Sequence, residues 1–112
     1  NFENYDEFEI NSKKLDEFNF EKKVSFIKID VEGHEIEVLE GSKELIKKFK
    51  PTLMIEIEER HSKRSLEESI SYVCSLGYEV FCLKNKELVP FQNITNPKDF
   101  NNFIFKSFFS SR

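Results

Sequence analysis

Glycine is scarce in this sequence, and its scarcity excludes one familiar kind of binding site. The chain has 112 residues but only three glycines, which are Gly33, Gly41 and Gly77. None of them forms a Gly-x-Gly turn between a strand and a helix, the arrangement by which many α/β folds bring their backbone close to a dinucleotide or a phosphate. The sequence therefore contains no glycine-rich cofactor cradle.

Cysteines, clustered positive charges and long apolar runs are also few or missing. Cys74 and Cys82 have neither CxxC spacing nor a nearby histidine pattern, which predicts two reduced thiols in a cytoplasmic protein. The net charge is −4, with acidic and basic residues interspersed, and this argues against nucleic-acid binding. No apolar run approaches the length that spans a membrane, and no signal sequence opens the chain. We therefore expect neither a nucleic-acid nor a membrane partner.

The most informative stretch is residues 24–41, which predicts a strand, an acidic turn and a helix. Residues 24–29 are mostly apolar and β-branched or aromatic, as in a buried strand. The acidic turn Asp30-Val31-Glu32-Gly33 follows, and residues 34–49 then show helical periodicity. Gly41 predicts either a bend in this helix or the close approach of another backbone. This pattern is half of a βαβ unit.

The remaining patterns predict a single α/β domain over residues 1–112. Because a helix joins the strands at 24–29 and 52–57, these two should be parallel. Turns and loops join the last strands, which predicts an antiparallel C-terminal edge. The other expected elements are a strand at 8–10, a helix at 12–20, a helix opened by a Ser65–Glu68 capping box and closed by Gly77 at C′, strands at 78–83, 88–89 and 103–106, a loop at 91–102, and a loose tail at 107–112.

Four segments carry a resemblance to a known family: IKIDVEGHEIEVLEG at 27–41, PTLMIEIE at 51–58, LGYEVFCL at 76–83 and NFIFK at 102–106. Together they resemble the FkbM family of S-adenosylmethionine-dependent methyltransferases. The upstream Lys14-Leu15-Asp16 is similar to the Thr-Leu-Asp element of the family, and the similarity extends over about residues 8–106.

The resemblance implies the C-terminal half of a class I, Rossmann-like methyltransferase domain. In this family the first half holds S-adenosyl-L-methionine, partly through a glycine-rich turn that these 112 residues lack. The parent protein is expected to methylate a hydroxyl oxygen of a sugar or another small metabolite. The residues that bind the cofactor are expected in the missing half, so this chain alone should neither bind the cofactor nor catalyse the transfer.

Asp30 and Glu32 are the expected catalytic pair, because ligands of open α/β sheets bind beyond the carboxyl ends of parallel strands. They are suited to bind substrate hydroxyls, to accept a proton from the attacking oxygen, or to hold a cation. The simpler alternative is that Asp30 caps the next helix and Glu32 is solvated.

Four further residues are expected to line the cleft: Gly33, His34, Glu35 and Glu58. His34 is more simply a polar residue of the first helical turn, and Glu35 an acid favoured at a helix N-terminus. Either Glu56 or Glu58 can face the cleft, and Glu58 is nearer the carboxyl end of its strand, although a solvated edge explains both. Nothing in the spacing demands a metal site formed by Asp30, Glu32 and His61, so we expect no metal.

The absence of a glycine-rich cofactor turn is also consistent with a second class of function, a non-catalytic interaction domain derived from the methyltransferase fold. In this hypothesis Asp30 and Glu32 are structural. The strand at 24–29 would leave an edge open, and open edges favour association. A homo-oligomer formed through this edge is then expected.

Overall fold

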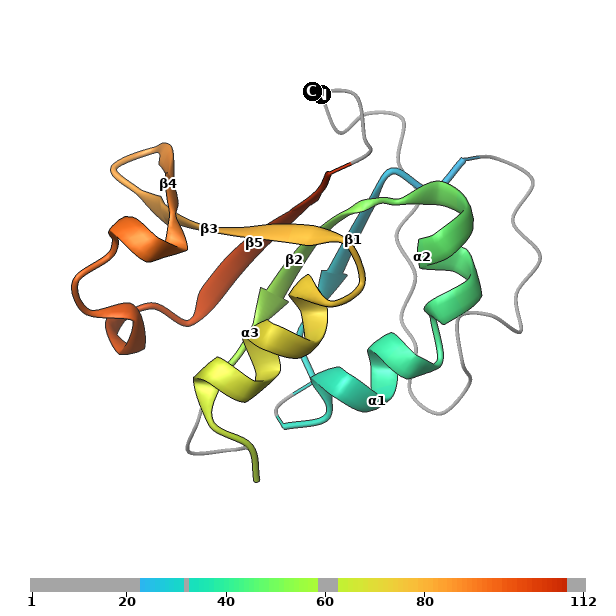
Figure 1. The fold of residues 1–112 in the computed structure, drawn as a ribbon, viewed down its shortest axis with the longest axis horizontal. Coiled ribbons are helices and arrows are strands. Elements are labelled where there is room, and N and C mark those ends of the chain that lie inside the picture. The colour runs from blue at the N-terminus through green and yellow to red at the C-terminus, as the bar shows by residue number, and fades with distance from the viewer. Residues whose placement is uncertain (1–22, 32, 59–62, 109–112) are drawn as a thin grey trace.

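The computed structural model describes residues 23–31, 33–58 and 63–108, and these form one five-stranded sheet with helices packed on it (Figure 1). The strands run in the order β1-β2-β5-β3-β4 across the sheet. Their bounds are Phe26–Ile29 (β1), Thr52–Glu56 (β2), Tyr78–Lys84 (β3), Glu87–Pro90 (β4) and Asn102–Ser107 (β5). The predicted strand at 8–10, the predicted helix at 12–20 and the Lys14-Leu15-Asp16 element lie outside the described residues.

The strand directions confirm the predicted mixture of parallel and antiparallel pairs but change its layout. β1 and β2 are parallel, as expected from the helices between them. β5 is antiparallel to both of its neighbours and lies between β2 and β3, so the last strand is internal and the antiparallel edge is β4. Because β3 and β2 are each antiparallel to β5, β1, β2 and β3 all run in the same direction.

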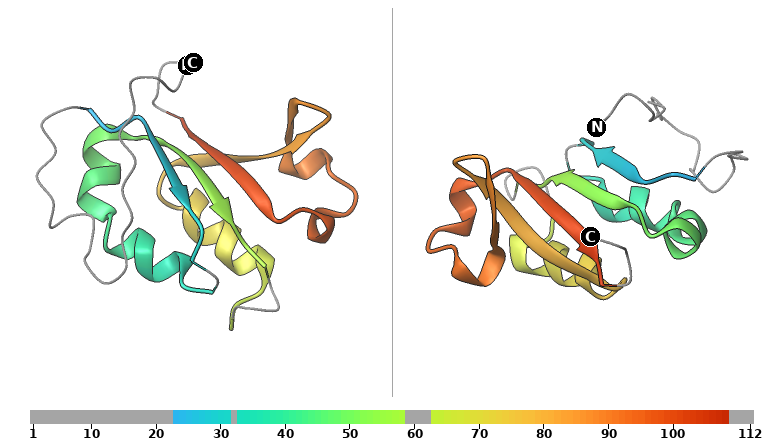
Figure 2. Two further views of the ribbon diagram at one scale, coloured as in Figure 1. Left: turned by 180° about the vertical axis from the view of Figure 1, so that it is seen from behind. Right: turned by 90° about the horizontal axis from the view of Figure 1, so that it is seen from above.

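The α-helices cover one face of the sheet (Figure 2). They are α1 at Glu35–Glu40, α2 at Lys43–Phe49 and α3 at Leu66–Cys74. The single helix predicted at 34–49 is thus broken at Gly41 and Ser42, and both of these residues are buried. The φ angle of Gly41 is −74°, so the break does not depend on a left-handed glycine, and the Ser42 hydroxyl donates to the Val38 carbonyl over 2.7 Å.

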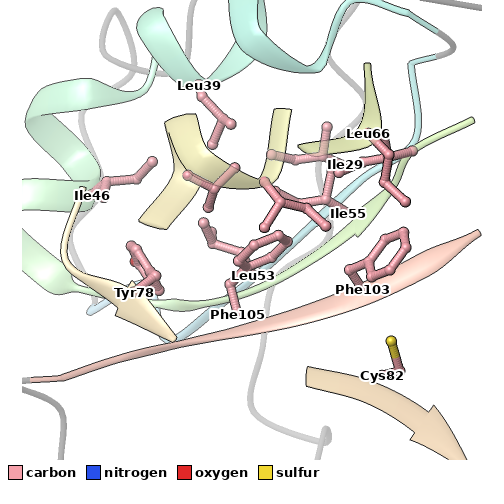
Figure 3. Packing of buried hydrophobic residues seen from close by; sticks show 13 residues of the cluster. Ile29, Leu39, Ile46, Leu53, Ile55, Leu66, Tyr78, Cys82, Phe103 and Phe105 are labelled. Atoms are coloured by element: carbon pink, nitrogen blue, oxygen red, sulfur yellow. The ribbon is translucent and has the colours of Figure 1, made fainter. Parts of the chain in front are cut away.

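Alternating side chains of the central strands form the core. Leu53 and Ile55 of β2 and Phe103 and Phe105 of β5 are completely buried. Figure 3 shows them in the space between the sheet and the helices, where Leu39 of α1 meets them. An alternating burial pattern of this kind is the signature of a sheet that buries one face.

The opposite face carries an apolar row at the middle of the sheet. Met54 of β2, Ile104 of β5 and Phe81 of β3 are direct neighbours in the strand register, and all three are partly buried. The exposed Lys28 and the half-buried Pro90 continue the row at its two ends. No helix of the described part of the chain covers this row.

The segments between the strands hold two features that the sequence pattern did not resolve. The loop predicted at 91–102 contains the 3₁₀ helices η3 at Phe91–Asn93 and η4 at Pro97–Asp99. The tail predicted to be loose begins inside the fold, because Ser107 is a buried residue of β5 and the Phe108 N–H donates to the Gly77 carbonyl over 3.0 Å. Residues 109–112 lie outside the described residues.

The start of α3 has the predicted capping box. The Ser65 N–H donates to the Glu68 carboxylate over 2.9 Å, and the Glu68 N–H donates to the Ser65 hydroxyl over 3.1 Å. At the other end the helix closes at Ser75, and Gly77 takes a left-handed φ of 96°. With Ser75 as the C-cap, C′ is Leu76, so Gly77 lies one residue beyond the C′ position that was predicted for it.

Replacing Ser65 with alanine should destabilise the protein by about 1 kcal/mol, because it removes the acceptor for a helix N–H that has no intrahelical partner. Chemical denaturation followed by circular dichroism measures this loss. The matched control is Ser71→Ala, which makes the same change at an exposed position within α3. Equal stability of the two variants would contradict the capping role.

The same box predicts a pH effect. The hydrogen bond from the Ser65 backbone and that from its side chain lower the pKa of Glu68 below its usual value. The contribution of Glu68 is therefore fully present above the carboxyl pKa of the unfolded chain, and it is lost as the pH falls through the lowered folded-state pKa. In Ser65→Ala this acid dependence should be weaker.

Candidate functional site

The candidate site lies at the edge of the sheet where β1 and β2 end and β5 begins. Ile29 pairs with Ile55 in the parallel register, so Asp30 comes opposite Glu56 just beyond the end of β1. Glu56 in turn pairs with Asn102, the first residue of β5. Asp30 and Asn102 are exposed and Glu56 is half-buried. We name these three residues, Asp30, Glu56 and Asn102, the acidic row.

The strand register also fixes the side of the sheet to which the acidic row belongs. Ile29 and Ile55 are buried beneath the helices, and successive strand residues alternate between faces. Glu56 and its partner Asn102 therefore belong to the face opposite the helices, next to the Met54–Ile104 part of the apolar row. Asp30 follows β1 at the same edge of the sheet, so two carboxylates and an amide gather where β1 and β2 end and β5 begins.

A tight turn joins β1 to α1 directly after Asp30. The His34 N–H donates to the Val31 carbonyl over 3.0 Å and closes this turn. Gly33 has a φ of 88°, a value that glycine adopts without steric cost. The N-cap residue of α1 is His34, and its side chain makes no capping hydrogen bond with the described part of the helix. The alternative in which Asp30 caps the helix is therefore wrong.

Glu35 lies inside the protein. Its side chain is only 1% exposed, and its Oε2 accepts the Gly33 N–H at 2.6 Å. It was predicted to line the cleft together with Gly33 and His34, but the structure directs it into the turn, whereas His34 is exposed. Glu35 and Gly33 thus contact each other, and Glu35 is not open to a ligand.

The end of β2 continues past the acidic row toward Glu58. The Ile57 N–H donates to the Asn101 carbonyl over 2.7 Å, which extends the pairing with the β5 segment by one residue. Glu58 follows as a half-buried residue. Nearby, Arg64 Nη2 lies 3.9 Å from Glu37 Oε2, an exposed pair of small energetic weight.

Two of the residues considered for the site, Glu32 and His61, lie outside the described residues. Within residues 23–31, 33–58 and 63–108, no group of three or more His, Cys, Asp or Glu side chains is placed to hold a metal ion. Both cysteine thiols are free, and burial raises the pKa of Cys74 and of Cys82. Because the thiolate is the reactive form, neither is suited to be a nucleophile.

Sequence reasoning placed Glu56 second to Glu58 and did not identify Asn102. Glu56 could have been predicted from the sequence, because residue alternation in a strand places it on the same face of β2 as Met54, and it is the last residue of that strand. Asn102 could not be found in this way. It reaches the site only because β5 lies beside β2, a pairing between residues far apart in the sequence.

The arrangement as a whole defines a class of protein. It is an α/β fold in which parallel strands joined by helices bring carboxylates to their carboxyl ends, the usual position of active sites in open α/β sheets. The family model described as "Methyltransferase FkbM domain" matches residues 1–80 of the chain. The chain belongs to this family. The match ends in β3, so it does not include the β3–β4 hairpin tip or β5, which the resemblance read from the sequence did include.

Two other comparisons gave no relative: no curated protein and no solved structure matched the chain. Among the helices that the structure describes, none has the length and apolar character needed to cross a lipid bilayer.

The residues present do not fit the methyl donor that the family implies. Gly33 is the one glycine of the sequence in a turn between a strand and a helix, and its N–H is already bound by Glu35. The helix that follows, α1, has only six residues, too short for the strong terminal dipole of a longer helix. Residues 23–31, 33–58 and 63–108 therefore provide no glycine-rich backbone cradle for S-adenosylmethionine.

Proposed function

We propose that this chain forms the acceptor side of an S-adenosylmethionine-dependent methyltransferase that methylates a hydroxyl oxygen of a sugar or another small metabolite. Membership of the FkbM methyltransferase domain family supports the reaction class. The acidic row supports an acceptor with hydroxyl groups, since carboxylate and amide oxygens accept hydrogen bonds from hydroxyls. The acidic row is the observation that carries the proposal.

In the proposed reaction Asp30 receives the proton that the acceptor oxygen releases. A neutral hydroxyl is a weak nucleophile, and removing its proton as the new carbon–oxygen bond forms lowers the barrier. Glu56 and Asn102 would hold a neighbouring hydroxyl, because they pair with each other at the edge of the sheet where Asp30 follows β1. The rate then depends on how well the acceptor oxygen is aligned with the methyl group.

We further propose a Rossmann-like sheet for the complete domain, with its glycine cradle supplied by chain outside these 112 residues. The parallel β1–β2 pair, with α1 and α2 between them, supports this, as does the common direction of β1, β2 and β3. A doubly wound sheet carries helices on both faces. Here the described helices occupy one face, which leaves the face with the apolar row for a second layer.

The experiment that tests the proposal is a methyl-transfer assay on the full-length protein. It is incubated with S-adenosylmethionine and a panel of sugars and polyols, and release of S-adenosylhomocysteine is measured together with the mass of the acceptor. We expect the mass of the acceptor to increase by one methyl group, and we expect this methyl group to be attached to an oxygen of the acceptor. Methylation at nitrogen or carbon only, or binding of the methyl donor without transfer to any acceptor, would contradict the proposal.

The second candidate is a non-catalytic interaction domain that assembles with a copy of itself. The apolar row of Met54, Ile104 and Phe81 favours it, since no helix of the described chain covers that row. β1, at one end of the described sheet, provides the edge predicted for association. Light scattering of the full-length protein distinguishes the two candidates, because a stable monomer that transfers methyl groups excludes this one.

A further inference from the structure

The buried carboxylate of Glu35 has no part in the proposed chemistry, yet it lies next to the residues that do. It belongs to the first turn of α1, five residues after Asp30, and only 1% of its side chain is exposed. Among its described neighbours in the sequence, the polar residues Asp30, His34 and Glu37 are all exposed. The Glu35 carboxylate is therefore buried, whereas the side chains of Asp30, His34 and Glu37 face solvent.

Burying a carboxylate is costly unless hydrogen bonds replace its lost water. The replacement for Oε2 is the Gly33 N–H at 2.6 Å, a short hydrogen bond. Gly33 has left-handed backbone, at a φ of 88°. The bond therefore holds one peptide of the turn through which the chain leaves β1.

The same turn is held from its other side by the backbone. The His34 N–H donates to the Val31 carbonyl, so Val31, Gly33, His34 and Glu35 form a small closed network immediately after Asp30. A network of this kind limits the directions that the backbone at Asp30 can take, because Asp30 is joined directly to Val31.

We propose that Glu35 is a positioning residue: through its bond to Gly33 it fixes the turn that presents Asp30 at the end of β1. This inference rests on the proposed function, in which Asp30 contacts the acceptor. Glu35 itself does not touch the substrate, since it is buried.

Nuclear magnetic resonance tests the contact directly in the full-length protein. Carbonyl-¹³C glutamate combined with ¹⁵N glycine selects glycines that follow a glutamate, and in these 112 residues those are Gly33 and Gly41 only. Gly41 is an internal control, because its N–H donates to the backbone carbonyl of Glu37 over 3.1 Å. In Glu35→Ala we expect the Gly33 proton to move upfield and to exchange with solvent about ten- to a hundredfold faster, with Gly41 unchanged.

Glu35→Gln keeps the size and an acceptor oxygen but removes the charge, so it guards against a variant that fails to fold. The Gly33 signal should then shift part of the way toward its position in the alanine variant. The matched control is Glu37→Gln, an exposed carboxylate of the same helix, which should leave Gly33 unchanged. A Gly33 signal that is the same in wild type, Glu35→Ala and Glu35→Gln would overturn the inference.

Methyl transfer by the same variants separates this inference from the proposed function. We expect Glu35→Gln to lower kcat at least tenfold with little change in the KM of the methyl donor, and the Glu35→Gln, Asp30→Asn double variant to be no slower than Asp30→Asn alone. If Asp30→Asn lowers kcat and Glu35→Gln does not, the positioning role of Glu35 is contradicted and the role of Asp30 is not. If Gly33 responds as expected while Asp30→Asn keeps full activity, the role assigned to Asp30 fails instead.

Discussion

Asp30→Asn in the full-length protein should lower kcat for methyl transfer by about a hundred- to ten thousandfold, the usual contribution of a general base. The substitution keeps the size of the side chain and removes its charge and its ability to take a proton. Asp30 is exposed at the carboxyl end of β1 and makes no capping contact with α1. The free energy of unfolding should therefore change by less than about 0.5 kcal/mol.

Two further variants show whether the effect is local to the acidic row. Glu56→Gln should also slow the reaction, by a smaller factor, and should raise the KM of the acceptor, because Glu56 is proposed to bind rather than to deprotonate. Glu87→Gln removes an exposed carboxylate from β4, at the other edge of the sheet, and should leave both constants unchanged. Full activity of Asp30→Asn would remove Asp30 from the mechanism.

Most of the fold could be predicted from the sequence because its elements are locally encoded. β1, β2, β3 and β5 each carry apolar residues bounded by turn residues, and the Ser65–Glu68 capping box marks the start of α3 unambiguously. The parallel β1–β2 pair followed from the helical connection alone. These features depend on residues close together in the chain.

The features that the sequence did not predict depend on contacts between distant segments. β5 lies between β2 and β3, and no local pattern states which strands a terminal strand will join. Its two phenylalanines, Phe103 and Phe105, are completely buried there, and this burial is the physical reason for the central position. The break between α1 and α2 is another such feature, since it depends on the buried environment of Gly41 and Ser42.

The candidate site shows the same division. Asp30 follows from its place after an apolar strand, and it lies where the βαβ pattern predicts. Glu35 was assigned to the cleft because it matches the glutamate of the family motif, but its carboxylate is buried and accepts the N–H of Gly33, the residue with left-handed backbone. Asn102 enters only through the β2–β5 pairing. A one-dimensional pattern gives positions along the chain and does not give the register between strands.

The central position of β5 leads to the largest expected loss of stability. Phe103 has no exposed surface and packs edge-to-face against Phe91 of η3, with ring centroids 6.1 Å apart. Phe103→Ala removes this contact and leaves a cavity beneath the helices, so the free energy of unfolding should fall by about 3–5 kcal/mol. Denaturant unfolding of the full-length protein followed by circular dichroism measures the change.

Phe108→Ala is the matched control, because it removes the same side chain from a position that is 57% exposed just after the same strand. It should cost less than about 0.5 kcal/mol. If Phe103→Ala does not fold, Phe103→Leu keeps an apolar side chain in the site and should cost about 1–1.5 kcal/mol. Similar losses at positions 103 and 108 would mean that β5 does not lie at the centre of the sheet. Asn102 would then be separated from Glu56, and the acidic row would lose its third member.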